Sequence, residues 1–133
     1  MQNGTVISCA YISEAIFQRI KNYTISDDDI YLTVAGTIGR VGTVPNEYHG
    51  ANLTENADKL ILNKNINKEW FIHYLNSAIC QNQISHCTTK VGQPKLAIKN
   101  IEQLLLELPP KYEQEKIASF TNLLLSEIKN LSI

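Results

Sequence analysis

The glycine-rich segment from Gly36 to Pro45 constrains the fold of this chain more than any other part of its sequence. It reads Gly-Thr-Ile-Gly-Arg-Val-Gly-Thr-Val-Pro and follows the β-branched run from Ile30 to Ala35. Two strands that meet at a tight glycine turn form an antiparallel hairpin, because glycine adopts the left-handed backbone conformations that such turns need. The segment lacks the Gly-Lys-Ser/Thr ending of a phosphate-binding loop, which disfavours a nucleotide site. We therefore expect a hairpin that holds Thr37 and Arg40 at its tip.

A second candidate contact segment is the loop from residue 88 to residue 96. Lysines occur here without acidic neighbours, since no Asp or Glu lies between residues 86 and 101. Pro94 restricts its own backbone and that of the preceding residue, so we expect a stiff loop. The polar residues of the loop, like Arg40 in the hairpin, are of the types that contact phosphates and base edges in DNA. A solvated connector and a plain glycine hairpin are the alternatives. The candidate DNA-contacting residues are Thr37, Arg40, Thr88, Lys90, Gln93 and Lys95.

Apolar residues that recur every three or four positions predict three amphipathic helices. They begin near Ser13, Asn67 and Lys111, and both Ser13 and Asn67 are suited to cap a helix N-terminus. The second helix is expected to run to about residue 85, with its aromatic residues in the core rather than in a base-stacking platform. Further strands are expected at residues 5–10, 59–62 and 104–108. These elements predict an α+β fold, in which the helix around residues 68–85 packs a small, strongly curved antiparallel or mixed sheet.

The last predicted helix follows two prolines, Pro109 and Pro110, and has a continuous apolar face. We expect this helix to project outward, so that its apolar face would form a sizeable exposed patch in a monomer. A symmetric homodimer, in which two such helices pair, is the natural way to cover it. The residues expected at this interface are Ile117, Phe120, Leu124, Ile128 and Leu131.

Composition excludes several classes of protein. The chain has 133 residues, a formal net charge of −1 and 44% hydrophobic residues, which suits one ordinary globular domain. The near-neutral charge excludes an arginine-rich binder that depends on bulk phosphate neutralisation. No apolar run approaches the roughly 18 to 20 residues that span a bilayer, and the N-terminus lacks the pattern of a secretory signal. We therefore expect a cytoplasmic protein without a membrane partner.

Neither a metal nor another cofactor is expected. The three cysteines carry no Cys-x-x-Cys spacing, and although His73, Cys80 and Cys87 recur every seven residues, this spacing is not that of a zinc site. The acidic triplet Asp27-Asp28-Asp29 precedes a strand and is better explained as a solvated turn. No dinucleotide-binding Gly-x-Gly-x-x-Gly, no methyltransferase Asn/Asp-Pro-Pro-Tyr and no nucleophile–base pair occurs, so catalysis is not expected.

The order of these motifs resembles the target recognition domain of the type I restriction–modification specificity subunit. The residues that carry the resemblance are Asp29-Ile-Tyr-Leu-Thr33, Gly36-Thr-Ile-Gly-Arg40, Phe71-Ile-His-Tyr-Leu-Asn-Ser77, Gly92-Gln-Pro-Lys-Leu96 and Leu108-Pro-Pro-Lys-Tyr-Glu-Gln-Glu-Lys-Ile117. The last of these, a Leu-Pro-Pro junction into a long helix, is the most specific. The resemblance extends from about residue 11 onward.

Several expectations follow from this resemblance. Residues 1–108 would form a partial target recognition domain, and residues 109–133 would begin the conserved spacer helix. The chain would recognise one part of a split double-stranded DNA sequence without catalysis, and its protein partners would be the methyltransferase and restriction subunits. A complete domain of the family carries several dozen more residues before Tyr11, so the chain resembles a truncated half. An assembly module that dimerises or docks a methyltransferase subunit without binding DNA is the alternative.

Overall fold

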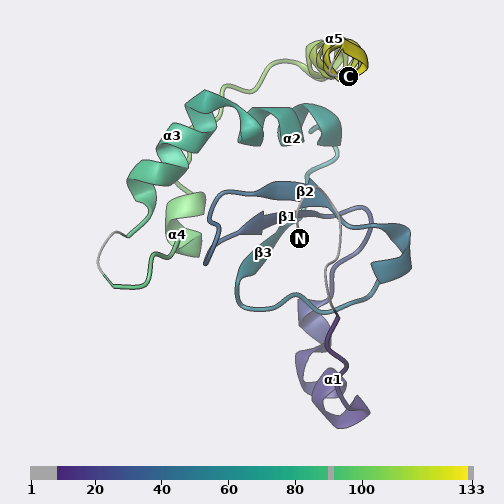
Figure 1. Ribbon diagram of the computed structural model, residues 1–133, viewed down its shortest axis with the longest axis vertical. Coiled ribbons are helices and arrows are strands. Elements are labelled where there is room, and N and C mark those ends of the chain that lie inside the picture. Colours follow the sequence, from purple (N-terminus) through teal and green to yellow (C-terminus); the bar gives the residue numbers. More distant parts are fainter. Residues whose placement is uncertain (1–8, 90–91, 132–133) are drawn as a thin grey trace.

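The structure is a computed structural model that describes residues 9–89 and 92–131. At its centre lies a three-stranded antiparallel sheet of order β2-β1-β3 (Figure 1). The strands are β1 (Ile30–Thr33), β2 (Val41–Thr43) and β3 (Ala57–Leu60), and each outer strand pairs with β1. The expected α+β class and antiparallel hairpin are confirmed. The third strand begins and ends two residues earlier than expected, because Ala57 pairs with Thr33 at the end of β1 and Leu60 pairs with Ile30 at its start. Residues 5–8 of the strand expected at 5–10 lie outside the described residues.

Helices cover the sheet on one side and extend from it at both ends of the chain (Figure 1). Helix α1 (Glu14–Ile20) begins after Ser13, whose hydroxyl oxygen accepts the N–H of Ile16 at 3.4 Å. Short 3₁₀ helices follow at η1 (Lys21–Tyr23) and η2 (Asn46–Tyr48). The single helix expected at residues 67–85 is instead two helices, α2 (Lys68–Asn76) and α3 (Ala78–Cys87).

The break between α2 and α3 is made by Ser77. Its backbone is extended, its side-chain oxygen accepts the N–H of Cys80 at 3.3 Å, and its hydroxyl donates to the carbonyl of Tyr74 at 2.6 Å. A serine that satisfies the free N–H groups of a new helix is a strong N-cap. Apolar residues continue at helical spacing across residue 77, so the sequence pattern alone predicts one uninterrupted helix.

The main core lies between the sheet and the two central helices. Its buried residues are Leu32, Val34, Leu75, Cys80, Ile84 and Leu96. Trp70 is also buried and stacks on Tyr74 with 5.7 Å between the ring centroids, while Tyr74 packs against the core. The prediction that these aromatic residues belong to the core is therefore confirmed.

The segment between the core and the last helix differs from its prediction. After helix α4 (Ile98–Ile101), residues 104–108 form no strand, although a strand was expected there. The polar groups of Leu105 pair with side chains instead: its N–H donates to Gln83 Oε1 at 2.8 Å, and its carbonyl accepts the Tyr74 hydroxyl at 2.6 Å. These hydrogen bonds satisfy the backbone groups that would pair with a neighbouring strand if residues 104–108 lay in a sheet.

Helix α5 (Lys111–Leu131) begins just after Pro110 and lies against α2. Its first half is anchored by Gln114 and Ala118, which are both buried. Every residue from 122 to 131 is exposed, so the second half projects beyond the body of the protein as expected.

Candidate nucleic-acid interface

The turn between β1 and β2 is closed by the side chain of Thr33. Its hydroxyl oxygen accepts the N–H of Arg40 at 2.9 Å, and the hydroxyl donates to the carbonyl of Thr37. The backbone adds two bonds of 2.9 Å, from Gly39 N–H to the Thr33 carbonyl and from Thr33 N–H to the Arg40 carbonyl. A left-handed conformation was expected at Gly36 or Gly39, and both glycines adopt it, with φ values of 69° and 86°. Thr37 and Arg40 are exposed at this turn.

A second closed turn lies between α3 and α4. The N–H of Lys95 donates to the hydroxyl oxygen of Thr89 at 3.1 Å, and the N–H of Thr89 donates to the carbonyl of Lys95 at 3.2 Å. Gly92 has a φ of 74° within this turn. Gln93 and Lys95 are exposed. The base of the turn is held by Thr88, whose half-buried hydroxyl donates to the carbonyl of Ile84 at 2.7 Å. Lys90 lies outside the described residues.

The two turns are joined through the backbone. The N–H of Leu96 donates to the carbonyl of Val34 at 2.9 Å, and Ala35 forms an antiparallel bridge with Lys95. Leu96 is only 1% exposed, which anchors this junction in the core. In Figure 1 the β1–β2 turn and the α3–α4 segment accordingly lie on the same side of the molecule. We name the surface formed by residues 36–40, 88–89 and 92–95, most of which are exposed, the two-turn surface.

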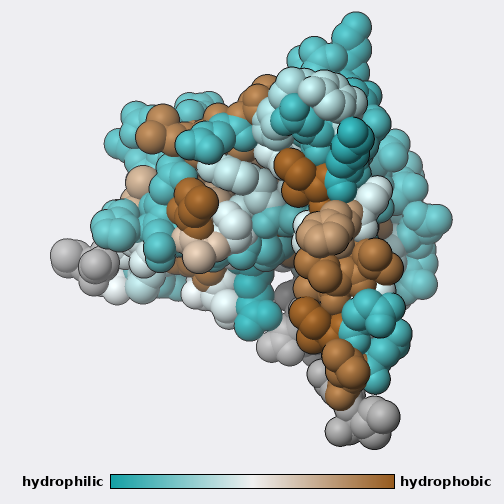
Figure 2. All heavy atoms as spheres, turned by 90° about the horizontal axis from the view of Figure 1, so that it is seen from above, coloured by the Kyte–Doolittle hydropathy of each residue, from teal (hydrophilic) through white to brown (hydrophobic). Residues whose placement is uncertain are grey.

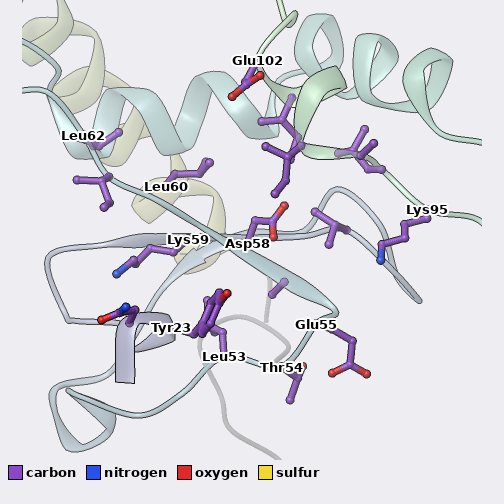
Figure 3. Close-up of a pocket in the computed structure, with 18 of the residues that line it drawn as sticks. Tyr23, Leu53, Thr54, Glu55, Asp58, Lys59, Leu60, Leu62, Lys95 and Glu102 are labelled. Carbon is purple, nitrogen blue, oxygen red and sulfur yellow. The ribbon is translucent and has the colours of Figure 1, made fainter. Parts of the chain in front are cut away.

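A groove beside this surface has a different chemistry. It runs along β3, has a volume of about 990 Å³ and is lined mainly by apolar side chains (Figure 3). Three carboxylates, Glu55, Asp58 and Glu102, line the groove together with two lysines, Lys59 and Lys95. Burial raises the pKa of Asp58, and the positive charge of Lys95 opposes that rise. Because acidic groups repel phosphate, the basic two-turn surface is better suited to DNA than the groove is.

Two supporting residues could not be found from the sequence. Thr33 closes the hairpin turn, and Gln81 on α3 donates from Nε2 to the carbonyl of Gly39 at 2.9 Å. A threonine in a strand and a glutamine in a polar helix segment are ordinary at both positions. Their roles depend on neighbours that are distant in sequence or on the turn geometry, and no local pattern reveals them.

The histidine and cysteine residues that recur every seven positions have separate surroundings. His73 Nε2 lies 2.7 Å from Asn122 Oδ1, while Cys80 is fully buried in the core, and burial raises the pKa of its thiol. Among residues 9–89 and 92–131, no group of three or more His, Cys, Asp or Glu side chains is placed to hold a metal ion. Within the same ranges, no helix is long and apolar enough to cross a membrane.

The expected interface residues on α5 all lie on the surface. Figure 2 shows hydrophobic side chains gathered in a stripe along this helix. We name this stripe the α5 face, and its exposed residues include Ile117, Phe120, Leu124, Ile128 and Leu131. The helix lies against α2 through other residues: Gln114 and Ala118 are buried, and Asn122 bonds to Glu69 and His73 of α2.

Comparison with known proteins identifies the class of this protein. The family model described as the type I restriction modification DNA specificity domain matches residues 2–132, and the chain belongs to this family. The resemblance drawn from its motifs is therefore confirmed, as is its expected place among specificity components rather than enzymes.

Two relatives show how much of a longer protein the chain matches. It is 26% identical over 107 residues to the type I restriction enzyme EcoBI specificity subunit of Escherichia coli, which covers 80% of this chain and 22% of that protein. The crystal structure of the HsdS subunit from Thermoanaerobacter tengcongensis has a similar fold, with a TM-score of 0.68 and 18% identity. That similarity covers 81% of this chain and 28% of the HsdS chain. The chain thus spans less than a third of either relative.

Proposed function

We propose that this chain recognises a specific sequence in double-stranded DNA through its two-turn surface and does so without catalysis. Arg40 and Gln93 contact base edges, where guanidinium and amide groups can form paired hydrogen bonds. Lys90 and Lys95 contact phosphates, and Thr37 adds a hydroxyl group to the same contact region. Thr88, whose hydroxyl proton is donated to the Ile84 carbonyl, adds an acceptor oxygen only. The proposed target is one part of a split sequence, as the family resemblance implies.

The backbone junction between Val34 and Leu96 is the observation that carries this proposal. It joins two residues 62 positions apart, Val34 and Leu96 (96 − 34 = 62), and so brings the two turns to one side of the molecule. Each turn is closed by a threonine side chain, Thr33 in one and Thr89 in the other. A preformed pair of turns loses little conformational entropy on binding, which favours a selective contact.

We further propose that two parts of the chain have different roles. Residues 1–108 form a partial target recognition domain, and residues 109–133 form a spacer helix that meets methyltransferase and restriction subunits. The bonds that attach the start of α5 to the body support this division. Gln114 Oε1 accepts the N–H of Asn67 at 2.7 Å, and Lys111 Nζ donates to the carbonyl of Lys64 at 2.9 Å.

Selection from a random duplex pool tests DNA recognition directly. The full chain is mixed with the pool at several salt concentrations, and the bound fraction is sequenced. We expect a short enriched motif and an affinity that falls as salt rises. Arg40→Ala should weaken the enrichment, whereas Arg19→Ala, an exposed arginine on α1, should leave it unchanged. A folded protein that shows no binding at low salt would contradict the proposal.

Assembly through α5 is the second candidate function. The α5 face supports it, since Phe120 is 62% exposed and Leu124 is 46% exposed. Exposed apolar stripes of this kind commonly mark protein interfaces. We propose that the face pairs with a second copy of the same helix. Analytical ultracentrifugation of Phe120→Ser/Leu124→Ser should show less self-association than the parent chain, with Ser119→Ala/Ser126→Ala as the control pair. A parent chain that remains monomeric at high concentration would contradict self-pairing.

A further inference from the structure

Gln81 on α3 connects the β1–β2 turn to the helical layer. Its side-chain Nε2 donates to the carbonyl of Gly39 at 2.9 Å and to the carbonyl of Leu75 at 2.7 Å. Because a carbonyl oxygen can only accept, both partners require the NH₂ end of the amide. The contact with Gly39 crosses 42 positions of sequence and ends one residue before Arg40.

The break between α2 and α3 makes this double bond possible. Leu75 and Gln81 are six residues apart, and in one continuous helix such residues lie on different faces. After the extended residue Ser77 the chain starts a new helix, and the Gln81 amide then reaches both the last turn of α2 and the hairpin. The break between α2 and α3 thus allows the Gln81 side chain to bond the Gly39 carbonyl at the two-turn surface.

The approach of Gln81 to the turn is close. Gly39 is buried, and a Cβ added to it would lie 2.8 Å from Gln81 Oε1 and 3.4 Å from Ile84 Cγ2. The turn is therefore held from two sides. Thr33 fixes the backbone at Thr37 and Arg40 from the strand, and Gln81 fixes the intervening Gly39 carbonyl from the helix.

We infer that Gln81 is a positioning residue for sequence selectivity, which orients the turn carrying Arg40 without touching DNA itself. This inference rests on the proposed function of the two-turn surface. Phosphate contacts determine how steeply affinity falls with salt, whereas base contacts determine preference for one sequence. Loss of the Gln81 amide leaves the number of phosphate contacts unchanged and misorients a base-reading side chain. A Gln81 variant should therefore show lower selectivity for one DNA sequence, while the slope of log affinity against log salt stays the same.

Gln81→Met tests this inference because methionine has a similar length and lacks the amide. The matched control is Gln83→Met, since Gln83 is also half-buried on α3 and its amide also bonds a backbone, that of Leu105. Two quantities are measured on the full chain. One is hydrogen–deuterium exchange at the amides of Gly39 and Arg40. The other is the ratio of affinities for an enriched duplex and a scrambled duplex over a range of salt.

We expect Gln81→Met to accelerate exchange at Gly39 and Arg40 and to lower the affinity ratio about tenfold, as expected for one lost base contact. The slope of log affinity against log salt should stay the same, and Gln83→Met should change neither the exchange nor the ratio. An unchanged ratio in Gln81→Met, or an equal loss in both variants, would overturn the inference. A Gln81→Met variant whose salt slope changes while its ratio of affinities stays the same would also overturn the inference.

A second variant covers the case in which Gln81→Met does not fold. Gln81→Glu keeps the side-chain shape but, when ionised, cannot donate to either carbonyl, and we expect the same loss of selectivity. The failure of the proposed function is distinguishable from that of the inference. If the parent chain shows no preference for any duplex, the proposed function fails and the inference fails with it. If the parent chain is selective and both Gln81 variants are equally so, only the inference fails.

Discussion

The ring of Tyr31 lies directly over Gly42, its cross-strand partner in the β1–β2 hairpin. A Cβ added at Gly42 would lie 2.6 Å from the Tyr31 hydroxyl oxygen and 2.8 Å from Cζ. Tyr31 is 1% exposed and packs with Ile25 and Val44 on the face of the sheet opposite the main core. Gly42 is therefore required for space rather than for a turn conformation.

Gly42→Ala should destabilise the protein by about 1–3 kcal/mol, because the added methyl group overpacks a buried ring. Chemical denaturation measures this change in the free energy of unfolding. Adding Tyr31→Phe removes the nearest clashing atom, so the double variant should recover part of the loss. Thr43→Ala, on the exposed neighbour, is the control and should have a smaller effect. An effect of Gly42→Ala no larger than that of Thr43→Ala would contradict the steric explanation.

Gln114 is the buried polar residue that joins α5 to the start of α2. Besides accepting from Asn67, it donates from Nε2 to the carbonyl of Pro109 at 2.8 Å and to the carbonyl of Asn65 at 3.3 Å. Gln114→Leu removes the side-chain partner of these part-buried backbone groups, and we expect a loss of about 1–3 kcal/mol in stability. Thermal and urea denaturation check this, with the exposed Gln103→Leu as the control. Equal stability of the two variants would show that the junction contributes little.

The half-buried carboxyl of Asp58 should make stability depend on pH. Because burial raises its pKa in the folded protein, the folded state holds the proton more tightly than the unfolded state does. Stability should therefore fall as pH rises from the ordinary carboxyl pKa through the raised value, and then level off. Asp58→Asn should remove this fall and be more stable than the parent chain at neutral pH. Unfolding curves at several pH values check this, with exposed Asp28→Asn as the control; an identical pH profile for parent and Asp58→Asn would contradict it.

Local signals in the sequence predicted the parts of the fold that local chemistry determines. Ser13 and Asn67 are suited to capping, and both cap the helices expected of them, because a cap needs only the N–H groups a few residues ahead. The left-handed Gly36 and Gly39 likewise follow from the needs of a tight turn. These features depend on neighbours within one turn of chain.

Features that depend on distant partners were missed. The apolar run at residues 104–108 favours a strand, but it pairs with no strand in the described part of the chain, and Leu105 remains 77% exposed. Ile79 fits the helical stripe and yet is 69% exposed, because the break at Ser77 redirects α3. For the candidate site, the sequence identified both turns as separate segments. Their junction at Val34 and Leu96 is a long-range contact, and neither spacing nor composition encodes it.

Lys95 provides the most direct measurement of the proposed phosphate contacts. Its side chain is exposed on the two-turn surface, and its backbone bonds to Thr89 do not depend on the side chain. Lys95→Ala should therefore weaken binding to all duplexes alike and reduce the salt slope by about one, since one fewer counterion is released. Lys129→Ala, an exposed lysine near the end of α5, should leave the slope unchanged. Because loss of a base contact changes selectivity instead, an unchanged slope with altered selectivity would assign Lys95 to the bases.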